Sequence, residues 1–249
     1  MSGHSKWATI KHKKAALDAK RGKAFTRLIR EIQIAAREGG AEIETNPRLR
    51  TAVNAAKAQS MPQDNIKRAI MRGSGQLEGE TYEEITFEGY GPGGVAFFVE
   101  TVTDNRNRTV SELRHLFAKN GGNLGENGCV AWMFDKRSLI VVPKDAGSED
   151  ALMEAAVAAG SEDMRDEGDS WAIVSDPAAH DQVLEALGKI GVEPPSADVT
   201  RLPQNSVHVE GKQAAAVMRM FEAIEDHDDV QNVYANFDIE DRELEELTA

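Results

Sequence analysis

The spacing of apolar residues in the first third of the chain is helical. Between residues 23 and 38 they recur every three or four positions, and two glycines follow as a stop signal. Asn46 and Pro47 have the form of an N-cap followed by proline at the first helical position, which predicts a helix through about residue 59. Another short helix is predicted over 62–73. The sequence therefore predicts an all-helical N-terminal unit.

From residue 82 the apolar positions alternate with polar ones, which is typical of β-strands. Strands are predicted at 84–90 and 95–102, joined by a glycine-rich turn. Thr109 and Glu112 have the spacing of a capping box, which predicts that a helix begins there. The next strand is expected near 129–134.

A second alternation of elements follows. We predict strands at 139–142, near 170–174 and leading towards Leu202, with helices at 149–159 and 177–190 between them. This alternation favours a small ferredoxin-like sandwich, whose complete order is βαββαβ.

The last part of the chain resumes the interrupted unit. A strand at 206–209, a helix at 212–224 and a strand at 230–236 are predicted. Because 79–134 is short of elements for a closed sandwich, this stretch would complete it, and 135–205 would be an insertion.

The predicted fold class is multidomain α+β. A basic helical domain with a flexible N-terminal arm (1–78) precedes two ferredoxin-like α/β sandwich domains, one inserted in the other. The discontinuous sandwich is 79–134 plus 206–240 and the inserted one is 135–205. An acidic tail at 241–249 is expected to fray.

Charge divides the chain in the same place. Residues 1–75 hold 16 Lys and Arg against 6 Asp and Glu, whereas the remainder holds 13 against 36. A basic surface gains affinity for nucleic acid by displacing counterions from phosphates. The split predicts that the N-terminal part binds a polyanion that the acidic body avoids.

The arm combines one aromatic residue with many cations, a composition suited to phosphate neutralisation and base stacking. Its candidate contacts are His4, Lys6, Trp7, Lys11, His12, Lys13, Lys14, Lys20 and Arg21. Candidates along the later helices are Lys23, Arg27, Arg30, Arg48, Arg50, Lys57, Lys67 and Arg68. The alternatives are that Trp7 anchors the arm on its own bundle and that the cations form a solvated face.

A second basic segment, Asp-Asn-Arg-Asn-Arg at 104–108, lies between a predicted strand and a helix. Arg106 and Arg108, with Arg114 further along, are candidate phosphate contacts. The alternative is that the Asp and Asn residues serve only in turns and caps.

Several common functions lack their motifs. Cys129 is the only cysteine, the six histidines have no paired metal-ligand spacing, and the glycine-rich stretches lack a P-loop ending. No apolar run is long enough to span a bilayer. We therefore expect no cofactor, metal, small-molecule substrate or membrane partner, and a non-enzymatic, cytoplasmic protein for which a monomer is favoured.

A set of short motifs carries a family resemblance: GHSKW at 3–7, IKHKK at 10–14, RGK at 21–23, NPRLR at 46–50, MP at 61–62, DNI at 64–66, GYGPGGV at 89–95 and TDNRNRT at 103–109. Together they resemble the YebC/PmpR family, whose mitochondrial members are translational activators of cytochrome oxidase. The resemblance implies three domains, with the third inserted in the second.

The resemblance also implies two targets. Family members are described as DNA-binding transcriptional regulators, and others look like ribosome-associated factors that help proline runs through the peptidyl transferase centre. DNA and ribosomal RNA present the same phosphate charge, so charge does not separate them. A protein-binding adaptor remains a lesser alternative.

Overall fold

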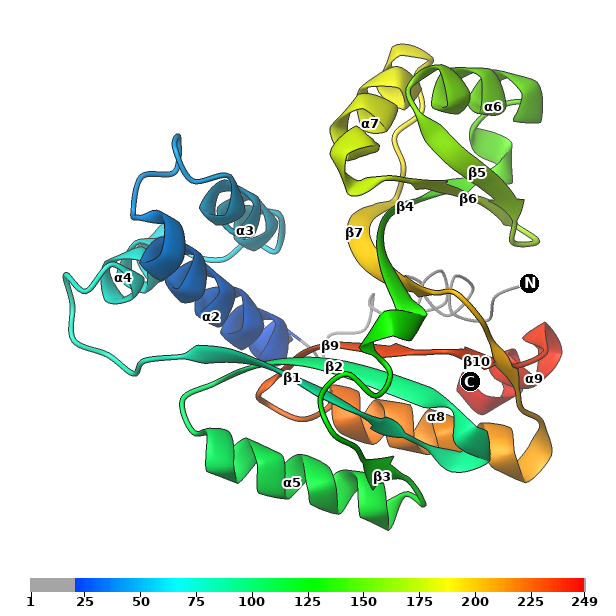
Figure 1. The fold of residues 1–249 in the computed structure, drawn as a ribbon. Helices are drawn as coiled ribbons and strands as arrows, with labels where there is room; N and C mark the ends of the chain where they lie inside the picture. The colour runs from blue at the N-terminus through cyan, green and yellow to red at the C-terminus, as the bar shows by residue number, and fades with distance from the viewer. Residues whose placement is uncertain (1–20, 249) are drawn as a thin grey trace.

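The structure, a computed structural model, describes residues 21–248. It begins with a bundle of α2 (Arg21–Gly39), α3 (Pro47–Ala58) and α4 (Gln63–Gly73) (Figure 1). The bundle has its own core, in which Ile32 and Leu49 are fully buried. The three predicted helices are confirmed.

Asn46 fixes the corner between α2 and α3. Its side-chain oxygen accepts from the Leu49 amide at 3.0 Å, and its side-chain nitrogen donates to the carbonyls of Ala35 at 2.7 Å and Gly40 at 2.8 Å. The predicted N-cap is confirmed, and its amide group also ends α2.

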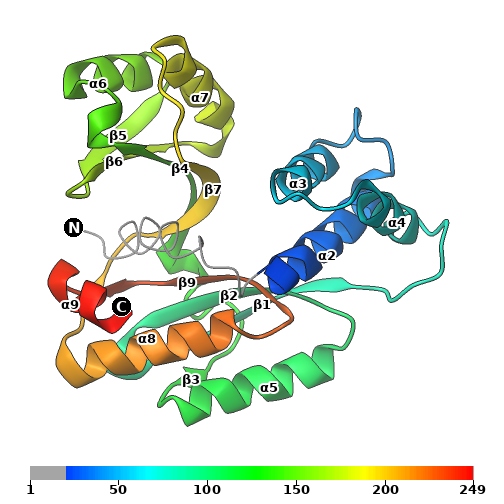
Figure 2. The ribbon, with the colours of Figure 1, turned by 180° about the vertical axis from the view of Figure 1, so that it is seen from behind.

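The next unit is a four-stranded antiparallel sheet in the order β3-β1-β2-β9. Its strands are β1 (Glu83–Tyr90), β2 (Ala96–Thr103), β3 (Asn123–Leu124) and β9 (Val230–Ala235). Helices α5 (Arg106–Lys119) and α8 (Gly211–Glu225) cover one face, and the inserted unit lies on the other side (Figures 1 and 2). Phe97 and Phe221 are buried in the core between this sheet and its helices.

The inserted unit has the βαββαβ order of a ferredoxin-like sandwich, with an antiparallel sheet β5-β6-β4-β7. Its elements are β4 (Phe134–Pro143), α6 (Glu149–Ala158), β5 (Ser161–Asp166), β6 (Ser170–Ser175), α7 (His180–Lys189) and β7 (Ser196–Pro203). A helical region followed by mixed α/β sheets is therefore confirmed.

The domain limits given by the sequence remain a proposal, which the distribution of the hydrophobic cores supports. One core lies within the bundle, a second joins residues 87–117 to 209–244, and a third lies within 140–197. None of the helices in residues 21–248 is long and apolar enough to cross a membrane.

The prediction that the acidic tail frays is wrong. Residues Asp241–Thr248 form α9, and Leu244 is fully buried against the core of the middle sheet. Just before it, β10 (Phe237–Asp238) pairs in parallel with β8 (Val207–His208). The apolar Leu244 therefore holds a segment whose composition is otherwise acidic.

Two local predictions in the middle unit are also wrong. Helix α5 begins at Arg106 with Asn105 as its N-cap, so Thr109 lies inside the helix instead of capping it. No long strand covers 129–134, where a 3-10 turn, η3 (Ala131–Met133), leads directly into β4. Other 3-10 turns are η2 (Pro92–Gly94), η4 (Lys144–Ala146) and η5 (Pro177–Ala179).

Candidate nucleic-acid interface

Most of the predicted arm contacts lie outside the described residues. These are His4, Lys6, Trp7, Lys11, His12, Lys13, Lys14 and Lys20. Arg21 is the first residue of α2, and only its backbone is described. The role of these nine residues stays a prediction.

Two cations of α2 contact the end of α8. Lys23 Nζ donates to the Asp226 carbonyl oxygen at 2.7 Å, and the Arg27 guanidinium donates to the Glu225 carbonyl oxygen. A helix C-terminus carries partial negative charge, so cations at this end are favourable. Burial lowers the pKa of Arg27, and the neighbouring carboxylates only partly oppose this effect. These contacts hold the start of α2 against the sheet domain.

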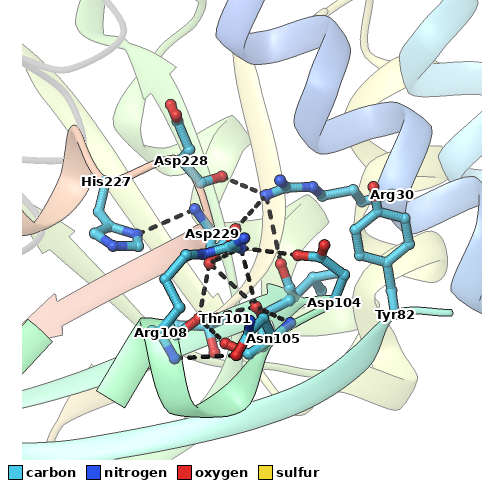
Figure 3. A network of polar contacts seen from close by, with 12 residues as sticks. Arg30, Tyr82, Thr101, Asp104, Asn105, Arg108, His227, Asp228 and Asp229 are labelled. Atoms are coloured by element: carbon cyan, nitrogen blue, oxygen red, sulfur yellow. Dashed lines mark hydrogen bonds and ion pairs between the residues drawn. The ribbon is translucent and has the colours of Figure 1, made fainter. Parts of the chain in front are cut away.

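Asp229 is the centre of a polar cluster between the bundle and the sheet (Figure 3). Its side chain, 2% exposed, accepts from Arg108 Nη2 at 2.8 Å, Thr109 Oγ1 at 2.7 Å and Thr103 Oγ1 at 3.1 Å. Arg30 Nη1 lies 3.2 Å from its other oxygen. Burial alone raises the pKa of Asp229, but the guanidinium and hydroxyl donors outweigh burial and hold it below its ordinary value.

The two arginines of this cluster, Arg30 and Arg108, also bind other groups within the protein. Arg108 also pairs with Asp104 at 2.8 Å, and Arg30 donates to the Asp228 carbonyl and stacks over the Tyr82 ring at 5.3 Å (Figure 3). Arg30 is on α2, and its side chain is only 11% exposed. Arg30 therefore joins the bundle to the sheet domain, whereas Arg108 is committed to contacts within the sheet domain.

Glu112, His227 and Asp229 bring potential metal-ligating atoms within 4.8 Å of one another. Both ring nitrogens of His227 are already used, because Nδ1 accepts from the Asp229 amide at 3.1 Å and Nε2 lies 2.8 Å from a Glu112 oxygen. A cation bound here would also stand beside two guanidinium groups. The donor set therefore fits an ion-pair cluster and does not fit a metal centre.

Arg48 is likewise engaged within the molecule. It forms ion pairs with Glu31 at 2.8 Å and Glu38 at 2.7 Å on α2, and with Glu84 on β1. The pKa of Arg48 is raised, chiefly by the hydrogen bond to Glu31. Arg48 therefore ties α3 to α2 and the bundle to the sheet.

A different set of cations faces solvent. Arg37, Arg50, Lys57, Lys67, Arg68 and Arg72 are exposed, and none forms an ion pair with a carboxylate of the described residues. Within residues 21–248, Arg50 donates only to the Glu44 carbonyl, at 3.3 Å. Residues 47–73 hold six Lys and Arg but only one carboxylate, Asp64. We name Arg50, Lys57, Lys67, Arg68 and Arg72 the α3–α4 surface.

The helices that carry the α3–α4 surface lie away from the middle sheet (Figure 1). Helices α3 and α4 pack around the end of α2 that points away from the middle sheet (Figure 1). Arg50 and Lys57 are seven positions apart on α3, and Arg68 and Arg72 are four positions apart on α4, so each pair lies on one helix face. Arg106 and Arg114 are exposed on α5, in the sheet domain, separately from this surface.

The glycine-rich loop after α5 binds an internal anion. The amides of Gly128, Val130 and Ala131 donate to the Glu88 carboxylate at 2.7, 2.8 and 2.7 Å. Glu88 is 3% exposed. Successive amides of this kind often hold phosphate, but here the carboxylate of β1 occupies them.

Comparisons with known proteins cover nearly the whole chain. The family model described as TACO1/YebC protein N-terminal domain matches residues 5–76, and the one described as TACO1/YebC second and third domain matches residues 82–237. The chain belongs to the TACO1/YebC family.

Relatives of this TACO1/YebC protein are similar over their full length. A probable transcriptional regulatory protein of Koribacter versatilis is 61% identical over 99% of both chains, and one of Solibacter usitatus is 60% identical over 100% of both. The crystal structure of a conserved hypothetical protein from Aquifex aeolicus is 49% identical, with a TM-score of 0.83 over 94% of this chain and 97% of that one. The family is thus a regulatory one by the names of its members.

Sequence reasoning missed the residues that bind the predicted arginines. Asp229 and Glu225 lie about 120 and 200 positions from their partners Arg108 and Arg27. The only sequence signal was the acidic run at 225–229, directly before β9. In this TACO1/YebC protein that run is the surface on which α2 docks.

Proposed function

We propose that this protein is a non-enzymatic, cytoplasmic regulator of gene expression that binds nucleic acid through the α3–α4 surface, together with the arm. The observation that carries the proposal is the exposure of the five cations of this surface without ion-pairing carboxylates among the described residues. The regulatory names of the relatives support it.

The proposed interface contains fewer cations than the sequence alone suggested. Arg30, Arg48 and Arg108 already donate to carboxylates, so a phosphate would have to displace Asp229, Glu31 or Glu84. The Arg30–Asp229 pair is buried, so breaking it costs several times the value of an exposed pair, and Arg48 would have to leave three carboxylates at once. We therefore assign phosphate binding to exposed cations and structural roles to these three arginines.

Duplex DNA is the target that the names of the relatives favour, and one local feature is compatible with it. Helices α3 and α4 are joined by four residues, with Ser60 in the left-handed conformation (φ 60°), which makes the turn tight. A second helix after such a turn can present its first residues to the major groove. Lys67 and Arg68 are exposed in the middle of α4, one turn after its first residues.

Structured RNA, including ribosomal RNA, is the second candidate. Proteins recognise RNA largely through phosphates, shape and unstacked bases. An exposed tryptophan elsewhere in the protein, Trp132, favours a target with unpaired bases.

A charge-reversal variant tests the proposal. Lys67→Glu with Arg68→Glu should strongly weaken binding to both promoter-length duplex and ribosomes. The matched control is Lys212→Glu with Arg219→Glu, which reverses two exposed cations on α8. Equal binding by the two variants would reject the α3–α4 surface.

The target is decided by competition at one ionic strength. Cosedimentation with ribosomes is measured in the presence of increasing concentrations of promoter-length duplex. Retention of the duplex is then measured in the presence of increasing concentrations of ribosomes. Ribosome binding that excess duplex does not displace identifies RNA as the target. Failure of the intact protein to bind either partner at low salt would contradict the proposed function.

A further inference from the structure

Trp132 is the most exposed large hydrophobic side chain in the described part of the chain, with 61% of its surface accessible. It lies in η3, at the point where the middle sheet leads into the inserted domain. Its neighbours Val130 and Phe134 are buried. The indole face is therefore accessible to a ligand, while the positions two residues before and after it pack into the protein.

Trp132 and Tyr90 are held by the same acceptor. The indole Nε1 donates to the Cys129 carbonyl at 3.3 Å, and the Tyr90 hydroxyl donates to the same oxygen at 3.2 Å. Tyr90 is 38% exposed. The polar atoms of both rings are thus satisfied within the protein, and what each ring offers to solvent is aromatic surface.

The segment that carries Trp132 and the Cys129 carbonyl, to which both rings donate, is held in place by a buried carboxylate. The buried Glu88 carboxylate binds the amides of Gly128, Val130 and Ala131, on both sides of Cys129. The two rings therefore have little conformational freedom to lose when a ligand binds. Such preorganisation raises affinity without any additional contact.

The surroundings match a base better than a phosphate. Asn123 lies directly opposite Tyr90 in the β1–β3 ladder and is exposed, so an amide side chain stands beside the aromatic ring. Residues 120–133 contain no Lys or Arg and one exposed carboxylate, Glu126. Aromatic rings and an amide recognise the face and edge of an unpaired base.

The size of the patch also argues against a protein partner. Tyr90 and Trp132 are the only exposed large hydrophobic residues between 78 and 152. A stable protein interface needs about 800 Å² on each side with an apolar centre, which two partly exposed rings do not supply.

We propose that Trp132 and Tyr90 form a stacking site for an unpaired nucleobase, with Asn123 beside it to bind the base edge. This inference rests on the proposed function and adds a second, uncharged contact in the sheet domain. A base within a duplex is already stacked, so the site selects single-stranded or looped segments.

Fluorescence of a single tryptophan tests the site. The chain has three tryptophans, so Trp7→Phe with Trp171→Phe leaves Trp132 as the only one. Titration of this full-length variant with a 20-nucleotide oligo(U) RNA should quench its emission, and a perfectly paired duplex of equal length should not. Filter binding of the same samples should give the same Kd.

Substitution separates stacking from charge. Trp132→Ala should lower affinity for oligo(U) by about 5- to 160-fold, which corresponds to the stacking of one base, while the salt dependence of binding stays unchanged. Trp132→Phe should retain most of the affinity, and Trp132→Leu should resemble the alanine variant. Circular dichroism of each variant checks the fold, and the quenching experiment needs no substitution at 132.

Three results would overturn the site. They are unquenched emission while oligo(U) binds, affinity of Trp132→Ala within twofold of the parent, and full affinity of Trp132→Leu, which would mark an apolar surface for a protein partner. Each leaves the α3–α4 surface standing. If the intact protein binds neither RNA nor duplex, the proposed function itself fails.

Discussion

Removing the Asp229 carboxylate tests whether the polar cluster between bundle and sheet holds the two together. In Asp229→Ala the Arg30 guanidinium, 11% exposed, loses its only ion pair among the described residues and keeps its contacts with backbone carbonyls. Removing one partner of a buried pair costs about 3–5 kcal/mol. Arg108 is 41% exposed and can be rehydrated, so we expect a loss of about 3 kcal/mol.

Asp229→Asn separates charge from shape. The amide oxygen still accepts from the threonine hydroxyls, so this variant should lose about 1–2 kcal/mol, less than the alanine variant. Arg30→Met added to Asp229→Ala should recover part of the loss, because no unpaired guanidinium remains. The free energy of unfolding is measured by urea titration, with the m-value as a check on cooperativity.

The pH dependence has a definite sign. Because the folded-state pKa of Asp229 lies below its unfolded value of about 3.9, its contribution is complete above that value and is lost as pH falls towards the folded pKa. The stability gap between the wild type and Asp229→Asn should therefore narrow below about pH 4.

The control is Asp163→Asn, which removes an exposed carboxylate paired with Arg165 at 2.7 Å. An exposed pair of this kind contributes at most about 1 kcal/mol. If Asp229→Ala destabilises the protein no more than Asp163→Asn does, the cluster does not hold bundle and sheet together.

Three further substitutions test other parts of the fold by thermal or urea unfolding. Leu244→Ala should lower the free energy of unfolding by about 2–5 kcal/mol, because the side chain is fully buried. A loss below about 0.5 kcal/mol would show that α9 is dispensable for stability. Asn46→Ala should cost about 1–3 kcal/mol, since three hydrogen bonds end there. Glu88→Gln should cost about 2–3 kcal/mol and increase the acrylamide quenching of Trp132, because an amide cannot accept all three loop amides; unchanged quenching would show that the loop is fixed by other contacts.

Local signals predicted the elements that local chemistry determines. The N-cap at Asn46 and the helices of the bundle follow from residues within a few positions of one another. The order of elements in the inserted domain was also recognisable. Its strand β5 was missed because Ser161–Asp166 is almost entirely polar, and its pairing with β6 replaces the missing apolar signal.

Long-range contacts explain the failures. Thr109 has the right spacing for a capping box, but its hydroxyl is used by Asp229, 120 positions away, and Asn105 caps the helix instead. In the acidic tail, one apolar residue, Leu244, packs into the core of the middle sheet, which lies far away in sequence. The charge of Arg30 and Arg108 was visible in the sequence, but their carboxylate partner was not.

The charge split in the sequence therefore predicted a basic region but not which cations are available. Of the candidates in residues 21–248, Arg50, Lys57, Lys67 and Arg68 remain exposed on α3 and α4, whereas Arg30 and Arg48 are used as structural ion pairs. Arg72 completes the α3–α4 surface. Whether a cation is exposed or bound in an internal ion pair depends on the fold, so the sequence alone did not separate the two groups.

The salt dependence of nucleic-acid binding tests the central claim most directly. The slope of log Kobs against log salt concentration is measured for the intact protein, for Lys67→Glu with Arg68→Glu, and for the control pair on α8. If both residues contact phosphate, the slope should fall in magnitude by about 0.9 per contact on duplex, or about 0.7 on single strands, and the control should keep the full slope. An unchanged slope in the α4 variant would contradict the account.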